Sequence, residues 1–513
     1  MSIGHLPNAL VLEATGRTLA LAGSVAALAG LFGGGLAWLL TRTDLSGSRV
    51  LGRLLSVPYA LPAYLLGMAW VMLGNPTVGL LKHWLPTQGA YGFGGMTWVE
   101  TSVAFAFPFL ELRAAFDRLD PALEEAARMS GASPGQVFRD VSFPLLWPSW
   151  LNGICLAFLY AIASFGVPAI LGLPVRQFVL TTLIYSQFKL GGAEGITTGL
   201  ELSLILLGIA MIVLVGSMTW LRRLRRRSGA IGGAKSSRPS QVTLGRWKWP
   251  ISALSWLCFT LVVIVPWVGL GLSALAPVAG DYRPNAWTLT HLMYVFGLSD
   301  FREALFNSAL LAVTVSALLL CGSFLLAFAA VRRGSQAARL WIEFLGLPFA
   351  SPGTVIAVLV IFVSTWTANG LGHLGISVDS PLLWMAVAYL IKHAAISARI
   401  LVASFSQIHP ALEEAARMSG ARTVRLLWDI WVPLLRKSLW AAALLTALPI
   451  LTELTMSVLL TGPGAATLGT VLFQLQEYAD QPSAAALAWL LLTAALLAAF
   501  LSGDSNTAAE TTP

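Results

Sequence analysis

The sequence predicts an all-α membrane protein that crosses the bilayer many times and contains two parallel repeats. Hydrophobic residues make up 57% of the chain and charged residues only 11%, and the mean hydropathy is +0.75, which excludes an ordinary soluble protein. Apolar stretches of about 20 residues, enough to cross the hydrocarbon of a bilayer, recur along the chain. A twelve-residue segment that begins at Pro121 recurs without a mismatch from Pro410, which indicates an internal duplication.

The repeated segment predicts a short helix, a break and a second short helix. Asp120 stands before Pro121, so we expect a side-chain cap followed by proline at the first helical position. Gly131 and Gly420 are expected to end the first helix, because glycine accepts the left-handed conformation found at helix ends.

The second helix of each copy begins differently. Residues 133–136 form a capping-box pattern in the first copy, and Thr423 gives a weaker version in the second. Pro144 and Pro433 are expected to end the repeated module where the chain becomes apolar again.

We expect about eleven spans, five before the repeat boundary and six after it. In the second span Pro58 and Pro62 predict a kink, and Pro348 and Pro352 recur at the matching place in the other half. The expected spans are 18–40, 54–74, 97–116, 150–173, 196–220, 250–275, 305–330, 340–366, 381–401, 440–460 and 484–501.

The basic residues predict the orientation of the chain. Arg42, Arg49 and Arg53 follow the first span, and a basic run occupies residues 222–227. Because basic residues favour the cytoplasmic side, both repeated loops should be cytoplasmic. The two halves then run the same way, as in transporters with a central pathway between the repeats.

The predicted organisation is a first permease repeat over 1–222, a cytoplasmic linker over 223–249, a second repeat over 250–502 and a polar cytoplasmic tail over 503–513. Glu13 aligns with Glu303, so the first half lacks a counterpart of the span at 250–275. Either this arrangement is tolerated or the true start lies upstream.

No pattern for enzymatic chemistry is visible. None of the six lysines follows a glycine, so no phosphate-cradling loop is predicted, and there is no zinc-binding His pair or Gly-x-Ser-x-Gly elbow. Cys155, Cys258 and Cys321 lie singly in apolar runs and are interpreted as small buried hydrophobes. We therefore predict no catalytic residue, metal site or cofactor, and no nucleic-acid partner, because the basic residues lie at the ends of spans.

The repeated loop resembles the cytoplasmic loop of binding-protein-dependent ABC importer permeases. The resemblance lies in Glu-Ala-Ala, a Gly four residues later and a Pro thirteen residues after the Gly. In that family the loop is the coupling helix, which docks on the ATP-binding subunit. The coupling residues implied are Glu124, Glu125, Ala126, Ala127, Arg128, Gly131, Pro144, Glu413, Glu414, Ala415, Ala416, Arg417, Gly420 and Pro433.

The resemblance covers nearly the whole chain and implies the type I permease fold. It also implies two ATP-binding cassette subunits that hydrolyse ATP in place of this chain, an extracytoplasmic solute-binding protein and a multi-pass location in the bacterial plasma (inner) membrane. Residues 165–172 and 180–185 are similar to ferric iron permeases, so ferric iron is the expected solute. Thiamine, polyamine, sulfate and phosphonate permeases share the architecture or the loop and stay open as alternatives.

Two charged residues within spans, Lys392 and Glu453, are candidates for the transport pathway. The alternatives are that Lys392 snorkels or pairs with Glu111 or another carboxylate, and that Glu453 makes a structural hydrogen bond. No cluster of ferric-iron ligands is visible, which favours transient passage over a stored metal.

A secondary transporter driven by an ion gradient is the alternative from another class, because such proteins also favour repeats of about six spans. It has no reason to carry two identical docking helices, and more functional charges within its spans would be expected.

Overall fold

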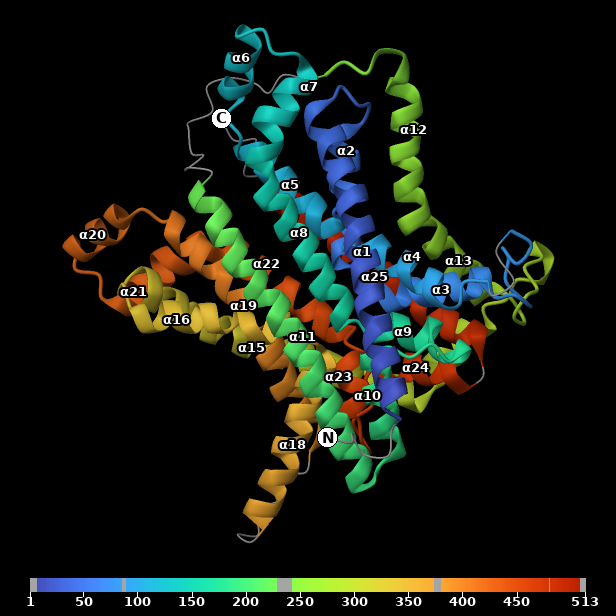
Figure 1. The fold of residues 1–513 in the computed structure, drawn as a ribbon. Helices are drawn as coiled ribbons and strands as arrows, with labels where there is room; N and C mark the ends of the chain where they lie inside the picture. The colour runs from blue at the N-terminus through green and yellow to red at the C-terminus, as the bar shows by residue number, and fades with distance from the viewer. Residues whose placement is uncertain (1–6, 85–88, 228–241, 373–379, 479, 508–513) are drawn as a thin grey trace. The chain divides into compact units, whose positions relative to one another are not determined.

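The computed structural model describes residues 7–84, 89–227, 242–372, 380–478 and 480–507, and that part of the chain is almost entirely helical (Figure 1). Its single extended pairing is an isolated bridge between Thr43 and Val242. The all-α prediction is confirmed.

The chain divides into two compact units, residues 1–289 with 488–492, and residues 290–487 with 493–513.

Eight helical segments in the described residues are long and apolar enough to cross a membrane. They are Asn8–Arg42 (α1), Gly135–Ala163 (ending in α8, Phe143–Ala163), Glu194–Leu221 (in α11, Gly192–Arg227), Gly245–Leu275 (η4, Gly245–Trp247; α12, Lys248–Phe259; η5, Thr260–Ile264; α13, Val265–Leu275), Ser299–Val331 (α15), Pro381–Gln407 (α19), Thr423–Leu451 (ending in α22, Val432–Leu451) and Gln481–Ala498 (in α25, Gln481–Thr507).

Two further helix pairs, each long and apolar enough to form one more span, are sharply bent next to the predicted prolines. One runs from Ser48–Leu54 (α2) through Val57–Ala60 (η1) to Ala63–Gly74 (α3) and bends by 96°; the other runs through Gln336–Phe344 (α16), Gly346–Ala350 (α17) and Gly353–Gly372 (α18) and bends by 104°. Leu61 and Ser351, which precede Pro62 and Pro352, are extended, because the proline ring disfavours helical backbone in the residue before it. The predicted kinks are confirmed.

The expected span at 97–116 is built from two helices, Phe93–Ala104 (α4) and Ala106–Arg118 (α5). Phe105 joins them in helical conformation, with φ −60° and ψ −22°. All eleven expected spans have a helical counterpart in the described residues, but only eight helical segments there, or ten with the two bent pairs, are long and apolar enough to cross a membrane.

The expected spans at 150–173 and 440–460 are each broken near the middle. α8 ends at Ala163 and α22 at Leu451, and the chain continues as the short helices Gly166–Leu171 (α9) and Thr455–Leu460 (α23). Ser164 is extended, and the backbone at Thr452 is no longer helical. Leu180–Leu190 (α10) and Leu468–Tyr478 (α24) follow.

Pro144 and Pro433 do not end the repeated module, and this expectation was wrong. The short helices Pro134–Val137 (α7) and Thr423–Leu426 (α21) continue through wide π turns, Phe138–Ser142 (η2) and Leu427–Trp431 (η7), into α8 and α22. A proline ring collides with the carbonyl one α-turn back. The π turn shifts that hydrogen bonding by one residue, so the helix passes through the proline without a break.

Within unit 1, α1 packs against α5 and α8, and α13 packs against α3. The segment 245–275 thus lies in this unit, although residues 250–275 belong to the second repeat as predicted from the sequence. Tyr282 Oη donates to the Met72 carbonyl oxygen over 3.3 Å and holds the loop after α13 to the end of α3. The proposed repeat boundary at residue 250 stays a prediction.

Within unit 2, α15 packs against α19 and α22. A buried cluster near the repeated loop includes Leu401, Phe405, Trp431 and Leu435. α25 extends to Thr507, so residues 503–507 of the predicted tail are helical. Residues 508–513 and most of the predicted linker, 228–241, lie outside the described residues.

Candidate functional site in the repeated loops

The first repeated loop folds as its sequence predicts. The helix Pro121–Met129 (α6) is capped by Asp120, whose Oδ1 accepts from the Ala122 N–H over 3.0 Å. Gly131 ends it with φ +85°. The Ser133 N–H donates to Gln136 Oε1 over 2.8 Å, and the Gln136 N–H donates to Ser133 Oγ over 3.4 Å, so the capping box is confirmed.

The second loop reaches the same form with a different cap. The helix Pro410–Met418 (α20) begins after His409, whose Nδ1 accepts from the Ala411 N–H over 3.2 Å. Gly420 has φ +82° and ends the helix as predicted. The histidine cap was missed because the sequence preference for caps favours oxygen acceptors.

Each loop helix has one buried and one exposed face. Glu124 and Glu413 are only 4% and 8% exposed, whereas Met129 and Met418 are 89% exposed. Residues spaced three or four apart share a helix face. We call the exposed, identical set the outer face: Ala122, Glu125, Ala126 and Met129 in α6, and Ala411, Glu414, Ala415 and Met418 in α20.

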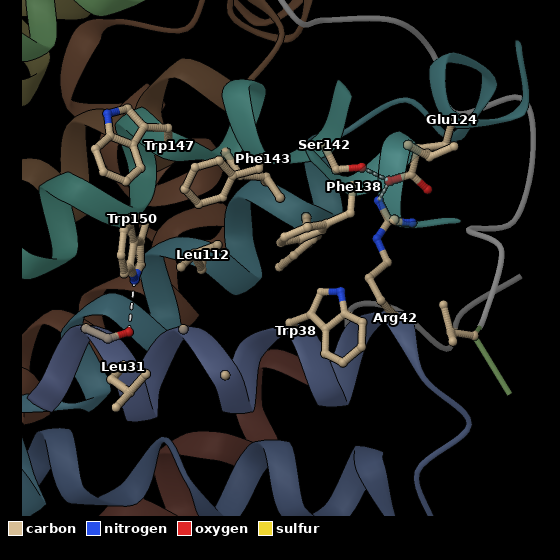
Figure 2. Close-up of a pocket in the computed structure, with 18 of the residues that line it drawn as sticks. Leu31, Trp38, Arg42, Leu112, Glu124, Phe138, Ser142, Phe143, Trp147 and Trp150 are labelled. Atoms are coloured by element: carbon tan, nitrogen blue, oxygen red, sulfur yellow. Dashed lines mark hydrogen bonds and ion pairs between the residues drawn. The ribbon is translucent and has the colours of Figure 1, made fainter. Parts of the chain in front are cut away.

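The buried glutamate of the first loop pairs with the end of α1. Arg42 Nη2 lies 3.1 Å from Glu124 Oε1, and Ser142 Oγ donates to the same oxygen over 2.7 Å (Figure 2). Arg128 Nη2 lies 3.9 Å from Glu124 Oε2. The Arg42 guanidinium also lies over the Phe116 ring, 5.2 Å from its centroid. Glu124 therefore joins α6, α1 and the π turn before α8.

The second loop repeats this arrangement with matching residues. Arg332 Nε lies 2.5 Å from Glu413 Oε1, and Trp431 Nε1 donates to that oxygen over 2.9 Å. Arg332 Nη2 donates to the Ile408 carbonyl oxygen over 2.8 Å. Trp431 occupies in the second repeat the position of Ser142 in the first.

Sequence reasoning missed these ion pairs, because Arg42 was interpreted only as a marker of orientation. A signal was present: Arg42 and Arg332 stand at the same register as Glu13 and Glu303, the pair that aligns the two halves. Removing one member of a buried ion pair leaves the other charge without compensation and costs about 3–5 kcal/mol.

The ion pair of unit 1 borders a cavity of about 590 Å³. Its walls come from α1, α5, η2 and α8, and Figure 2 shows Trp38, Phe138, Phe143 and Trp147 lining it, with Arg42 and Glu124 at one end. Trp150 Nε1 donates to the Gly30 carbonyl oxygen over 2.9 Å and fixes the opposite end. The lining is apolar apart from the polar groups at these ends.

The last part of the predicted linker, residues 242–248, is hydrogen-bonded to the end of α1. The Val242 N–H donates to the Arg42 carbonyl oxygen over 2.8 Å. The Leu244 N–H and the Lys248 ammonium bond the Asp44 carboxylate over 2.9 and 3.2 Å. The hydrogen bond from the Leu244 N–H lowers the pKa of Asp44 most, and the hydrogen bond from Lys248 lowers it further.

The two candidate pathway residues occupy structural positions in unit 2. Lys392 Nζ donates to the carbonyl oxygens of Phe349, over 3.1 Å, and of Ser351, which are left free by the break between α17 and α18. Glu453 Oε2 accepts from the N–H groups of Met456 and Ser457 over 2.9 and 3.1 Å and caps α23. A role for either in transport stays a prediction.

A further buried carboxylate escaped the sequence reasoning. Glu100 in α4 has no exposed surface and accepts a hydrogen bond from Ser164, at the end of α8. Tyr389 stands at the matching place in the second repeat, and its hydroxyl bonds Ser457 Oγ over 2.6 Å. The available signal was a charge in the apolar first half of the expected span at 97–116, well before Glu111 and Arg113 near its end.

A family model described as "Binding-protein-dependent transport system inner membrane component" matches residues 26–228 and 319–505. The two matches together cover well over half of the chain, and each includes one of the repeated loops.

Curated relatives are similar along most of the chain. The ferric transport system permease protein FbpB of Actinobacillus pleuropneumoniae is 26% identical over 461 residues, which are 85% of this chain and 63% of that protein. The Fe(3+)-transport system permease protein FbpB 2 of Haemophilus influenzae is 24% identical over 91% of this chain and 84% of its own length. A probable sulfate transport system permease protein, cysT of Nephroselmis olivacea, is 29% identical over 44% of this chain and 79% of its own length. The chain thus spans less than two thirds of the first of these relatives.

Proposed function

Because the chain belongs to the family of binding-protein-dependent transport system inner membrane components, we propose that it is the transmembrane permease subunit of an ATP-binding cassette importer. The observation that carries the proposal is the pair of identical outer faces. Each presents small alanines, a carboxylate and a highly exposed methionine, a surface that lets a partner approach closely and form a charge-assisted contact.

In this proposal each outer face docks on one ATP-binding subunit, so one chain takes two. ATP hydrolysis belongs to those subunits. The repeated loops then lie on the cytoplasmic side of the bacterial plasma membrane, in agreement with the basic run at 222–227. A solute-binding protein delivers the solute from the opposite side. Closure of the ATP-binding subunits moves both loops, and the spans carry the movement to the pathway.

Ferric iron is the solute that we propose, because two relatives that match most of this chain are named for ferric iron transport. Iron is the cargo here and crosses without a resident site. Thiamine, polyamine, phosphonate and sulfate are the alternatives that an uptake experiment must separate.

The coupling assignment is tested with Glu125→Arg and Glu414→Arg together. Reversing both exposed charges should abolish transport and reduce the co-purifying ATP-binding subunit at least tenfold, while the chain still inserts in the membrane. Asp140→Asn with Asp429→Asn is the matched control, since these exposed carboxylates lie beside the loops and off the outer faces; transport should stay within twofold of wild type. Transport at the wild-type rate in the charge-reversed variant would refute the assignment.

The solute is tested by uptake of labelled ferric iron in cells with and without the chain, with labelled thiamine and sulfate in parallel. Loss of iron uptake alone supports the proposed solute. Loss of another uptake alone keeps the importer and reassigns its solute.

A further inference from the structure

Each repeated loop is tied to a long span of its own unit by one buried ion pair. Arg42 is the last residue of the 35-residue α1, and Arg332 directly follows the 33-residue α15. Their partners, Glu124 and Glu413, lie on the buried faces of α6 and α20. The side chains of all four residues are at most 12% exposed.

The two ion pairs share a geometry that depends on the tertiary fold and not on contacts within one helix. The paired residues are far apart in sequence, so each ion pair exists only in the folded unit. In both, the glutamate Oε1 receives the arginine and a second donor from the π turn that leads into the next span. The second donor differs, Ser142 in one repeat and Trp431 in the other, whereas the ion pair is the same.

The glutamates at neighbouring positions therefore have different environments. Glu125 and Glu414 are exposed on the outer faces, where a partner can reach them. Glu124 and Glu413 are enclosed by their own unit, so their carboxylates contact this chain and not a docked subunit. In each loop the exposed glutamate is thus available to a partner, whereas the adjacent buried glutamate holds the loop to its own unit.

We infer that Glu124 with Arg42, and Glu413 with Arg332, are positioning residues that transmit the displacement of each docking helix to α1 and α15. The inference rests on the proposed function and assigns to these four residues the connection between loop and span. A loop without its ion pair still presents its outer face, but the span no longer follows the loop rigidly. ATP hydrolysis then continues with little transport.

The test uses the full-length chain purified with its ATP-binding subunits and reconstituted in liposomes with the solute-binding protein. Glu124→Gln with Glu413→Gln should leave the co-purifying ATP-binding subunit within twofold of wild type and ATP hydrolysis measurable. Transport per ATP hydrolysed should fall at least fivefold. The matched control, Glu125→Gln with Glu414→Gln, should lower co-purification instead.

A milder variant guards against a failure to fold. Ser142→Ala with Trp431→Phe removes the second donor to each glutamate, with some packing at position 431, and keeps both ion pairs. Transport per ATP hydrolysed should fall about twofold to threefold. Wild-type transport per ATP hydrolysed in a correctly inserted Glu124→Gln, Glu413→Gln variant would overturn the inference. If that variant does not accumulate, a wild-type value in the milder variant would overturn it. Loss of the ATP-binding subunit from the Gln variant would overturn it too, because Glu124 and Glu413 would then be docking residues.

A failure of the proposed function looks different from either result. In that case no ATP-binding subunit co-purifies with the wild-type chain, and no variant changes ATP hydrolysis.

Discussion

Glu124 receives its hydrogen bond from Ser142 in unit 1, whereas Glu413 receives it from Trp431 in unit 2. The small serine lies beside an apolar cavity, and the tryptophan packs in a buried hydrophobic cluster with Phe405. The helices that carry the two glutamates are identical over nine residues. An unchanged loop can thus rest on different packing, provided that the buried ion pair stays.

The cavity itself reflects a difference in residue size on one helix face. α1 has glycines at positions 30, 34 and 35, and the matching positions of α15 are Leu320, Phe324 and Leu325. Phe324 packs against the buried cluster of unit 2. Unit 1 leaves that space open and lines it with the aromatic residues of η2 and α8.

The largest expected effect comes from removing the arginines. Arg332→Ala leaves the Glu413 carboxylate buried without a cation and should cost about 3–5 kcal/mol in the free energy of unfolding. Arg42→Ala should cost less, because Arg128 remains 3.9 Å from Glu124. Thermal unfolding of the purified protein in detergent measures both, with Arg425→Ala, an exposed arginine, as the control. A lower midpoint for Arg42→Ala than for Arg332→Ala would contradict the comparison.

The second effect comes from the differing donors. Trp431→Phe and Ser142→Ala each remove one hydrogen bond to a buried carboxylate, which is worth about 1.5–3 kcal/mol. Trp431→Phe should be the more destabilising, since it also removes packing contacts from the buried cluster that contains Phe405. The same thermal unfolding measurement compares the two variants. Equal midpoints would show that the cluster around Trp431 adds nothing to stability beyond the hydrogen bond.

The third effect tests the cavity wall. A Cβ at position 34 would lie 2.8 Å from Trp150 Nε1, so Gly34→Ala must displace the indole that bonds Gly30 and should cost about 1–3 kcal/mol. The neighbouring Gly35→Ala meets nothing within 4 Å and should be neutral or slightly stabilising. If both variants unfold at the same temperature, Trp150 does not fix this wall.

The smallest effect should be equal in the two repeats. Gly131→Ala and Gly420→Ala place a side chain on left-handed backbone with φ +85° and +82°. Each should lower the free energy of unfolding by about 1–2 kcal/mol. Gly135→Ala is the control, because its Cβ also meets nothing within 4 Å and its φ is not positive. Unequal midpoints for the two loop variants would show that the identical helices end differently.

The spans and the ends of the loop helices were predictable because hydropathy, proline and glycine act over a few residues. Asp120, Gly131 and the kinks at Pro62 and Pro352 are such cases. The inward direction of Glu124 was not predictable, since it depends on which face of α6 meets α1. The π turn that carries the helix through Pro144 also escaped prediction, because it depends on how α6 and α8 are joined in three dimensions.

The burial of the ion pairs constrains how the sequence can vary. A lone arginine at position 42, or a lone glutamate at position 124, would be a buried charge without a counterion. A single replacement at either place therefore destabilises the fold more than a double replacement by apolar residues. The same holds for positions 332 and 413. Across related chains, substitutions at 42 and 124 should therefore occur together, as should those at 332 and 413. Under the proposed function, positions 125 and 414 should instead vary with the sequence of the ATP-binding subunit.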